Sequence, residues 1–204
     1  PAITPPKDGA TITPAKIIVK GRINSSAKDV GVTVAGIVAE ISGNNWIANN
    51  IPLSIGPNAI MAVATDSFGS KLSKAITVNT NNITQFVGLS ANITCGIPPL
   101  KVYFSIYTSS YTPVLYQMDF DGDGVADYAG ATFQNVSYTY TSEGIFYQTL
   151  RVTDNQGNVY SDTIAVTVVS GTEIDTLLRS KWEGMKQAMT DKDVEKALGY
   201  FIDQ

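Results

Sequence analysis

Hydrophobic and polar residues alternate in short runs along most of the first 170 residues, and glycine, proline, asparagine and serine interrupt these runs. In one run, for example, Ile164, Val166 and Val168 fall on the same side of an extended chain. A period of two residues predicts β-strands with one buried face and one solvated face. Strands of this kind, separated by turns, indicate antiparallel β-sandwiches. We expect them at residues 16–23, 30–41, 44–48, 59–66, 75–78, 100–107, 114–120, 136–141, 146–154 and 164–168.

One segment occurs twice, as a strand, a Thr-Asp pair, a glycine-bearing turn and a second strand. Residues 61–69 and 150–157 carry it, and their aspartates, Asp66 and Asp154, lie 88 positions apart (154 minus 66). That distance is about the length of one immunoglobulin-like (Ig-like) domain, which predicts two sandwiches in tandem. We expect each aspartate to accept hydrogen bonds from the backbone amides of its own turn, which is a structural role.

The pattern changes to helical spacing after Gly171. One apolar stripe and a second, shorter apolar set predict two helices, and their members are Ile174, Leu177, Leu178, Trp182, Met185 and Met189, then Val194, Ala197, Leu198 and Phe201. Thr172 and Asp175 resemble a capping pair for the first helix, and Thr190-Asp191 is expected to cap the second. Two short helices cannot bury this stripe by themselves. We expect them to dock on the second sandwich or, as we favour, to begin a third domain that the sequence truncates; a helical stalk is the alternative.

The predicted fold class is therefore all-β, with two tandem Ig-like antiparallel β-sandwiches followed by a short α-helical C-terminal segment. The predicted divisions are residues 1–80, 81–170 and 171–204. The chain opens on Pro1, and no basic start followed by an apolar stretch marks a signal peptide. We expect a piece of a longer protein whose other domains are its partners. No run of eighteen apolar residues occurs, so no membrane span is predicted.

Composition argues against several functions. A net charge of −4 and a pI near 4.7, without a cluster of lysine and arginine, disfavour a nucleic-acid partner. The chain has no histidine, the commonest general base and transition-metal ligand. Its single cysteine, Cys95, cannot form an intrachain disulfide, and its strand-like setting predicts a small buried residue. Gly-x-Ser-x-Gly and a glycine-rich phosphate loop are also missing, so we expect no enzyme within these residues.

One segment, residues 119–127, has the pattern of a metal-binding loop. Asp119, Asp121 and Asp123 alternate with other residues, and Asp127 follows a glycine by three positions. Calcium prefers six to eight oxygen ligands, and alternating aspartates on a tightly turned loop can point at one centre. On the scheme of an EF-hand loop, the three alternating aspartates take the first, third and fifth places, the Val125 carbonyl the seventh and Asp127 the ninth.

These five residues are the candidate metal ligands, and the predicted cofactor is a structural calcium ion. The match to the EF-hand loop is partial, because Gly130 stands at the twelfth place where a bidentate glutamate belongs. We therefore expect weak binding, with a dissociation constant of ~10⁻⁴–10⁻³ M. The alternative is that Asp-Gly pairs form turns and cap backbone amides without any metal.

The order of landmarks in the first segment resembles the bacterial Ig-like domains of the glucodextranase-B type. Residues 6–10, 19–21, 31–34, 51–58 and 63–69 carry the resemblance. Domains of this type are accessory modules of secreted glycan enzymes, so the resemblance implies a fold and no activity. Trp46 is either a platform for sugar stacking or, as we expect, a residue that packs in or against the sandwich.

The second segment resembles a PKD (polycystic kidney disease type) domain. Residues 98–102, 118–124, 138–146, 150–158 and 164–168 carry this resemblance. The family usually has Trp-Asp-Phe-Gly-Asp-Gly, whereas Met118 stands here in place of the tryptophan, and we expect it to fill the core with neighbouring tyrosines. The resemblance implies an Ig-like sandwich of cell surfaces and secreted bacterial hydrolases, where such domains act as spacers or as protein and glycan binders.

The predicted function is a non-catalytic extracellular or cell-surface spacer and adhesion or binding module with a structural calcium loop. The alternative is a carbohydrate-binding accessory region of a secreted glycan hydrolase. Nine of the ten tyrosines lie between Tyr103 and Tyr160. They indicate either a binding face or only good strand formers. A cell-surface protein or polysaccharide is the expected external partner.

Overall fold

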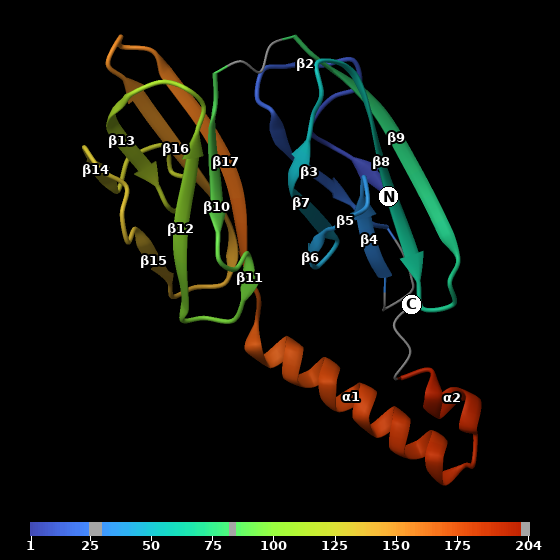
Figure 1. Cartoon of the computed structure of the whole chain (residues 1–204). Helices are drawn as coiled ribbons and strands as arrows, with labels where there is room; N and C mark the ends of the chain where they lie inside the picture. Colours follow the sequence, from blue (N-terminus) through green and yellow to red (C-terminus); the bar gives the residue numbers. More distant parts are fainter. Residues whose placement is uncertain (25–29, 82–84, 201–204) are drawn as a thin grey trace.

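The computed structural model describes residues 1–24, 30–81 and 85–200 and shows two β-sandwiches side by side with a helical segment below them (Figure 1). The strands up to β9 form the N-terminal domain, and β10 to β17 form the second domain. The predicted all-β fold class, with tandem Ig-like sandwiches and a C-terminal helical segment, is confirmed.

The N-terminal domain consists of two sheets that enclose an apolar core. One sheet has the order β1 (Ala2–Ile3), β3 (Lys16–Arg22), β7 (Asn45–Pro52), β6 (Glu40–Ser42). The other has the order β2 (Thr11–Ile12), β9 (Lys71–Thr80), β8 (Gly56–Asp66), β4 (Val30–Val34), β5 (Ile37–Val38). Trp46 is buried in the core between them, so the expectation that it packs in the sandwich is confirmed and a stacking platform at this residue is ruled out.

The second domain repeats this layered arrangement. Its smaller sheet has the order β10 (Val87–Ala91), β12 (Leu100–Thr108), β15 (Ser137–Tyr140). Its larger sheet has the order β11 (Cys95–Gly96), β17 (Val159–Val168), β16 (Gly144–Asp154), β13 (Pro113–Asp119), β14 (Tyr128–Gly130). Met118 and Tyr140 fill the core as predicted. Cys95 is exposed, because β11 is a two-residue strand at the sheet edge, so the prediction of a buried cysteine is wrong.

The repeated Thr-Asp segments form matching turns at the ends of β8 and β16. Asp66 Oδ1 accepts hydrogen bonds from the N–H groups of Phe68 and Ser70, each at 2.9 Å. Asp154 Oδ1 accepts from the N–H groups of Gln156 and Asn158, at 2.9 and 2.8 Å. Both aspartates therefore have the structural role predicted for them.

Two helices follow the second sandwich, α1 (Gly171–Thr190) and α2 (Val194–Leu198). The predicted caps are wrong, since Ser170 accepts a hydrogen bond from Glu173 N–H at the start of α1, and Asp193 accepts one from Lys196 N–H at the start of α2. Ser170 and Glu173 have the Ser-x-x-Glu spacing of a capping box, a stronger signal than the Thr172 and Asp175 pair. Of the helices in the described residues, none has both the length and the apolar character needed to cross a bilayer.

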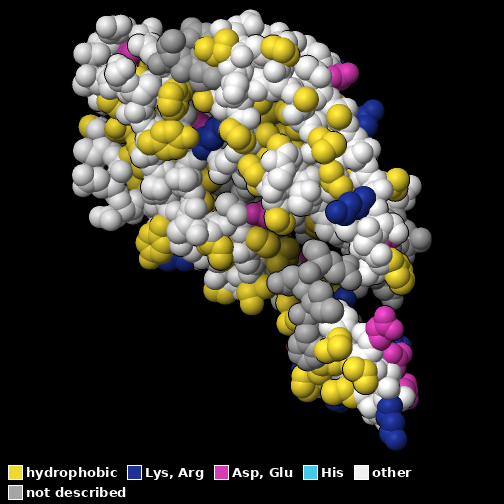
Figure 2. All heavy atoms as spheres, turned by 45° about the vertical axis from the view of Figure 1, so that its right-hand side comes forward, with side chains coloured by type: hydrophobic (Ala, Val, Ile, Leu, Met, Phe, Trp, Pro, Cys, Tyr) yellow, Lys and Arg dark blue, Asp and Glu magenta, His cyan; other side chains and the backbone are white. Residues whose placement is uncertain are grey.

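The apolar stripe of α1 is only partly covered. Met185 and Ala188 are its buried members, and α2 folds back on the helix (Figure 1). Leu177, Leu178 and Trp182 remain 48–62% exposed, and Figure 2 shows hydrophobic side chains gathered on this projecting segment. Phe201, predicted to belong to the second helix, lies outside the described residues.

Candidate functional site

The acidic loop begins at the last residue of β13 and is shaped by its first aspartate. Asp119 is buried, and its Oδ1 and Oδ2 accept the N–H groups of Gly122 at 2.7 Å and Gly124 at 2.8 Å. Both glycines have left-handed backbones, with φ of 84° and 91°, which other residues adopt only at a cost. The loop therefore curls around the Asp119 carboxylate because the sequence supplies glycine at these two positions.

The other end of the loop closes onto the same strand. Asp127 N–H donates to the Met118 carbonyl at 2.8 Å, and Asp127 Oδ2 accepts Phe120 N–H at 2.7 Å. β14 starts at the next residue and pairs with β13. The loop is thus held at both ends by backbone groups of a strand that belongs to the core.

These bonds bring three of the candidate ligands together. Asp119, Asp121 and Asp127 each offer a carboxylate oxygen, and the three oxygens lie within 4.8 Å of one another. In the described structure Asp123 lies outside this group, and its Oδ1 accepts Val125 N–H at 2.7 Å, just as the other three aspartates accept backbone N–H groups. A carboxylate oxygen that accepts one N–H keeps a second lone pair. The group therefore fits a hard cation that binds oxygen, such as calcium.

The base of the loop is fastened to the core by a buried polar contact. The Phe120 carbonyl accepts Tyr140 Oη–H at 2.9 Å and Gln148 Nε2–H at 3.2 Å. Burial raises the pKa of Tyr140, so its hydroxyl stays a neutral donor. Gln148 is fully buried on the face of β16 that otherwise carries apolar residues. Its polar side chain at an apolar position was the sequence signal for this contact.

An open groove of about 360 Å³ lies beside β12. Its lining combines aromatic rings with hydroxyl and amide groups, and it includes Tyr107, Thr108, Tyr116, Thr132, Phe133 and Gln134. Tyr107 is half exposed, and so is Tyr103 on the same strand. Other tyrosines have structural positions, since Tyr111 stacks on Tyr160 and Tyr138 packs against the buried Tyr140.

The N-terminal domain has a recognisable counterpart among known families. Residues 1–82 match the family model of glucodextranase, domain B. This glucodextranase-B-like domain ends where the second domain's strands are about to begin, and the resemblance predicted for it is confirmed. No match was found among curated proteins.

Solved structures similar to the chain include two kinds of small β-domain. The PKD1 domain of the Vibrio cholerae metalloprotease PrtV is 22% identical, with 43% of this chain and 100% of that chain covered and a TM-score of 0.34. The fibronectin(III)-like modules of Clostridium thermocellum CbhA are 15% identical, with 82% and 93% covered and a TM-score of 0.32. A PKD domain is thus among the similar structures, as the second segment's resemblance predicted.

A third similar structure is SGBP-B of a Bacteroides ovatus mixed-linkage glucan utilization locus, solved in complex with a mixed-linkage heptasaccharide. It is 13% identical, with 83% of this chain and 45% of that chain covered and a TM-score of 0.24. The matched region is less than half of that protein's length.

Proposed function

We propose that this chain is a non-catalytic module of a longer exported protein, serving as an extracellular spacer and as an adhesion or binding unit with a calcium-stabilised loop. The observation that carries the calcium-stabilised loop is the convergence of Asp119, Asp121 and Asp127 on a loop that is fixed to a core strand. The match of residues 1–82 to one domain of a larger enzyme supports the role of an accessory unit. Other domains of the longer chain and a cell-surface protein or polysaccharide would be its partners.

Calcium at this loop would act on stability and on shape. Asp119 is buried and accepts two N–H groups, whereas Asp121 and Asp127 are exposed and accept one N–H group each. A bound cation would offset the repulsion among the three carboxylates and restrict the exposed pair. With a dissociation constant of ~10⁻⁴ M, free calcium at about one hundred times that concentration adds about 2.7 kcal/mol to the free energy of unfolding.

Titration calorimetry and thermal denaturation with calcium or a chelator test this proposal. We expect calcium to release or absorb heat on binding and to raise the melting temperature of the wild type. Asp121→Asn should weaken both effects, because it removes an exposed carboxylate from the group without touching the bonds of Asp119. Asp175→Asn on α1 is the matched control and should respond as the wild type does. No heat and no thermal shift in the wild type would refute the calcium loop.

The groove beside β12 favours a second candidate function, carbohydrate binding in an accessory region of a glycan hydrolase. Small-molecule sites are concave and combine apolar rings with a few polar groups, and this groove places Tyr107 and Phe133 near the side chains of Thr108 and Gln134. Aromatic faces can stack on sugar rings while hydroxyl and amide groups bind sugar hydroxyls.

Affinity measurements with α- and β-linked glucan oligosaccharides test this second function. Tyr107→Ala should reduce binding at least tenfold. Tyr103→Ala is the matched control, because Tyr103 is equally exposed on β12 but does not line the groove, and it should leave binding unchanged. Absence of binding by the wild type, or an equal loss in both variants, would contradict a glycan site in the groove.

A further inference from the structure

The two sandwiches meet along an open sheet edge of the second domain. β17 is an outer strand over most of its length, since β11 pairs with only Thr167 and Val168. β3 and β7 of the N-terminal domain lie against β17 (Figure 1). Unpaired N–H and C=O groups on such an edge can pair with any extended chain, so proteins usually cover them.

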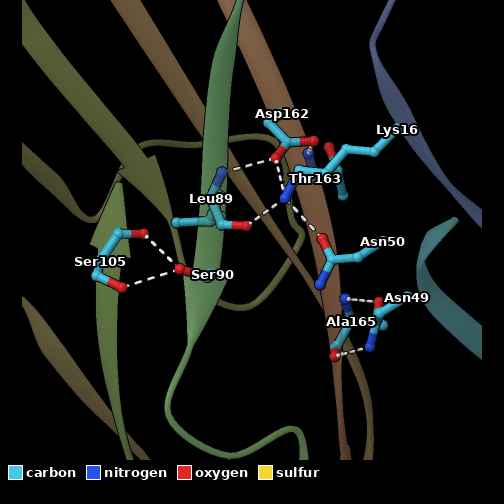
Figure 3. A network of polar contacts seen from close by, with 9 residues as sticks. All are labelled: Lys16, Asn49, Asn50, Leu89, Ser90, Ser105, Asp162, Thr163 and Ala165. Carbon is cyan, nitrogen blue, oxygen red and sulfur yellow. Dashed lines mark hydrogen bonds and ion pairs between the residues drawn. The ribbon is translucent and has the colours of Figure 1, made fainter. Parts of the chain in front are cut away.

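Asn49 of β7 covers this edge in the manner of an additional strand. Its Nδ2–H donates to the Ala165 carbonyl at 2.9 Å, and its Oδ1 accepts Ala165 N–H at 2.8 Å (Figure 3). A neighbouring antiparallel strand would make the same pair of bonds through its own backbone. One side-chain amide from the N-terminal domain therefore satisfies both backbone groups of a fully buried residue of β17.

Lys16 of β3 makes a second, charged contact between the domains. Its Nζ lies 3.0 Å from Asp162 Oδ2 of β17 and donates to the Leu89 carbonyl of β10 at 2.6 Å (Figure 3). It also donates to Asn50 Oδ1 at 2.6 Å, so all three ammonium hydrogens have acceptors. The side chains of Lys16 and Asp162 are 13% and 5% exposed, which places this ion pair in the interior of the contact.

Asp162 connects this lysine to the inside of the second domain. The oxygen that faces Lys16, Oδ2, also accepts Leu89 N–H at 2.7 Å, and Oδ1 accepts Thr163 N–H at 3.0 Å. Leu89 belongs to the smaller sheet and Asp162 to the larger one. The carboxylate therefore bridges the two sheets of the second domain, and the cation that neutralises it comes from the other domain.

An apolar centre lies next to these polar contacts. Ile47 of β7 and Ala165 of β17 are 2% and 0% exposed, yet neither belongs to the core cluster of its own domain. The strand neighbours of Ile47 also reach across: Lys20 Nζ lies 4.0 Å from the centre of the Tyr147 ring. Glu40, its neighbour on β6, faces Thr94 and Thr167, and burial raises the pKa of Glu40. Water is therefore excluded from the centre of this contact, at Ile47 and Ala165, while the charged groups around it are partly buried.

The backbone of the N-terminal domain is shaped for this contact. The register between β3 and β7 shifts between Ile17 and Val19, and Asn50 has a left-handed backbone with φ of 57°. Such an irregularity turns side chains toward a new direction. Asn49 and Asn50 lie within this irregularity. From there Asn49 contacts Ala165 of the second domain, and Asn50 contacts Lys16.

We infer that the N-terminal domain is an edge cap for the second domain, and that Asn49 and Lys16 join the two sandwiches into one rigid unit that unfolds in a single transition. The cap hides a strand edge that an extended peptide or a second copy of the chain would otherwise use for pairing. The direction of one sandwich relative to the other is then a property of the folded chain.

Scanning calorimetry of the whole chain tests the inference. The wild type should unfold in one transition whose calorimetric and van't Hoff enthalpies agree. Lys16→Met combined with Asn49→Ala should split this into two transitions and enlarge the radius of gyration measured by X-ray scattering. The matched control is Lys74→Met combined with Asn79→Ala, since both residues are exposed on β9, and it should keep one transition. Two separate transitions in the wild type would overturn the inference.

Asn49→Ala alone gives a second test that does not depend on the fate of the buried charge pair. Hydrogen exchange of the Ala165 amide should become at least tenfold faster in this variant, because its acceptor is removed. Exchange of amides in the β8–β9 hairpin should not change. Equal exchange of the Ala165 amide in wild type and variant would show that Asn49 does not cap the edge, and would overturn the inference.

Discussion

Both sandwiches contain an aromatic ring that lies across a glycine on the paired strand. Trp46 of β7 is opposite Gly21 of β3, and Tyr107 of β12 is opposite Gly88 of β10. A Cβ atom added to either glycine would overlap the ring opposite. The two rings differ in burial, since Trp46 is 1% exposed and Tyr107 is 50% exposed. The same local pairing therefore forms a core plug in one domain and a surface ring in the other.

The two aspartate turns differ in burial in the opposite sense, because here the buried residue belongs to the second domain. Asp66 in the N-terminal domain is partly exposed, whereas Asp154 in the second domain is 2% exposed. Asp154 Oδ2 also accepts the Asn158 amide at 2.9 Å and the Tyr160 hydroxyl at 3.2 Å. The local sequence thus determines the ring-over-glycine pair and the aspartate turn. The layers packed over each of them determine whether it lies in the core or at the surface.

The largest expected difference in stability is between alanine variants of the two glycines. Gly21→Ala should lower the free energy of unfolding by about 1–3 kcal/mol, because the new methyl group meets the buried Trp46 ring and the Ala2 backbone carbonyl. Gly88→Ala should change it by no more than about 0.5 kcal/mol, because the half-exposed Tyr107 ring can swing into solvent. Urea denaturation of the two variants measures both values. Equal losses would mean that the burial of the ring does not set the cost.

A smaller difference in stability is expected between asparagine variants of the two aspartates, and its size depends on pH. Hydrogen bonds from Asn158, Gln156 and Tyr160 lower the pKa of Asp154 below its ordinary value of 3.8. A lowered pKa contributes stability that is present above pH 3.8 and is lost as pH falls through the folded-state pKa. Asp154→Asn should therefore destabilise the protein at neutral pH, and the difference from wild type should shrink in acid.

Asp66→Asn is the matched variant for this measurement, because the same two-amide turn occurs without the contacts from Asn158 and Tyr160. Thermal denaturation between pH 2 and pH 7 should show a smaller loss for Asp66→Asn than for Asp154→Asn at neutral pH. If both variants lose the same stability at every pH, the extra bonds of Asp154 contribute nothing.

Much of the fold could be predicted from the sequence, because its strands and turns carry local signals. The alternation of Ile164, Val166 and Val168 corresponds to β17, and the repeated Asp66 and Asp154 turns indicated two domains. The burial of Trp46 was expected from the usual burial of large rings. The exposure of Cys95 was missed, because an edge position depends on which strands pair and no local pattern reports it.

The candidate site was predictable to a similar extent. The spacing of Asp119, Asp121 and Asp127 suggested carboxylates around one centre, and the structure places those three together; calcium binding stays a prediction. The role of Gln148 and the contact of Lys16 with Asp162 were not foreseen. Lys16 and Asp162 lie 146 positions apart (162 minus 16), so only the folded arrangement of both domains brings them together.

The short parallel strands at the domain edges have a mechanical consequence. β2 pairs in parallel with β9, the last strand of the N-terminal domain, and β11 pairs in parallel with β17, the last strand of the second. β1 precedes β2, and β10 precedes β11, so tension on the ends of a sandwich reaches these parallel pairs only after β1 or β10 has come away from its neighbour. The two strands of a parallel pair are then pulled in opposite directions along their length. Their hydrogen bonds are then loaded together in shear instead of opening one after another. Each pair is two residues long, so these few bonds bear the load as one group.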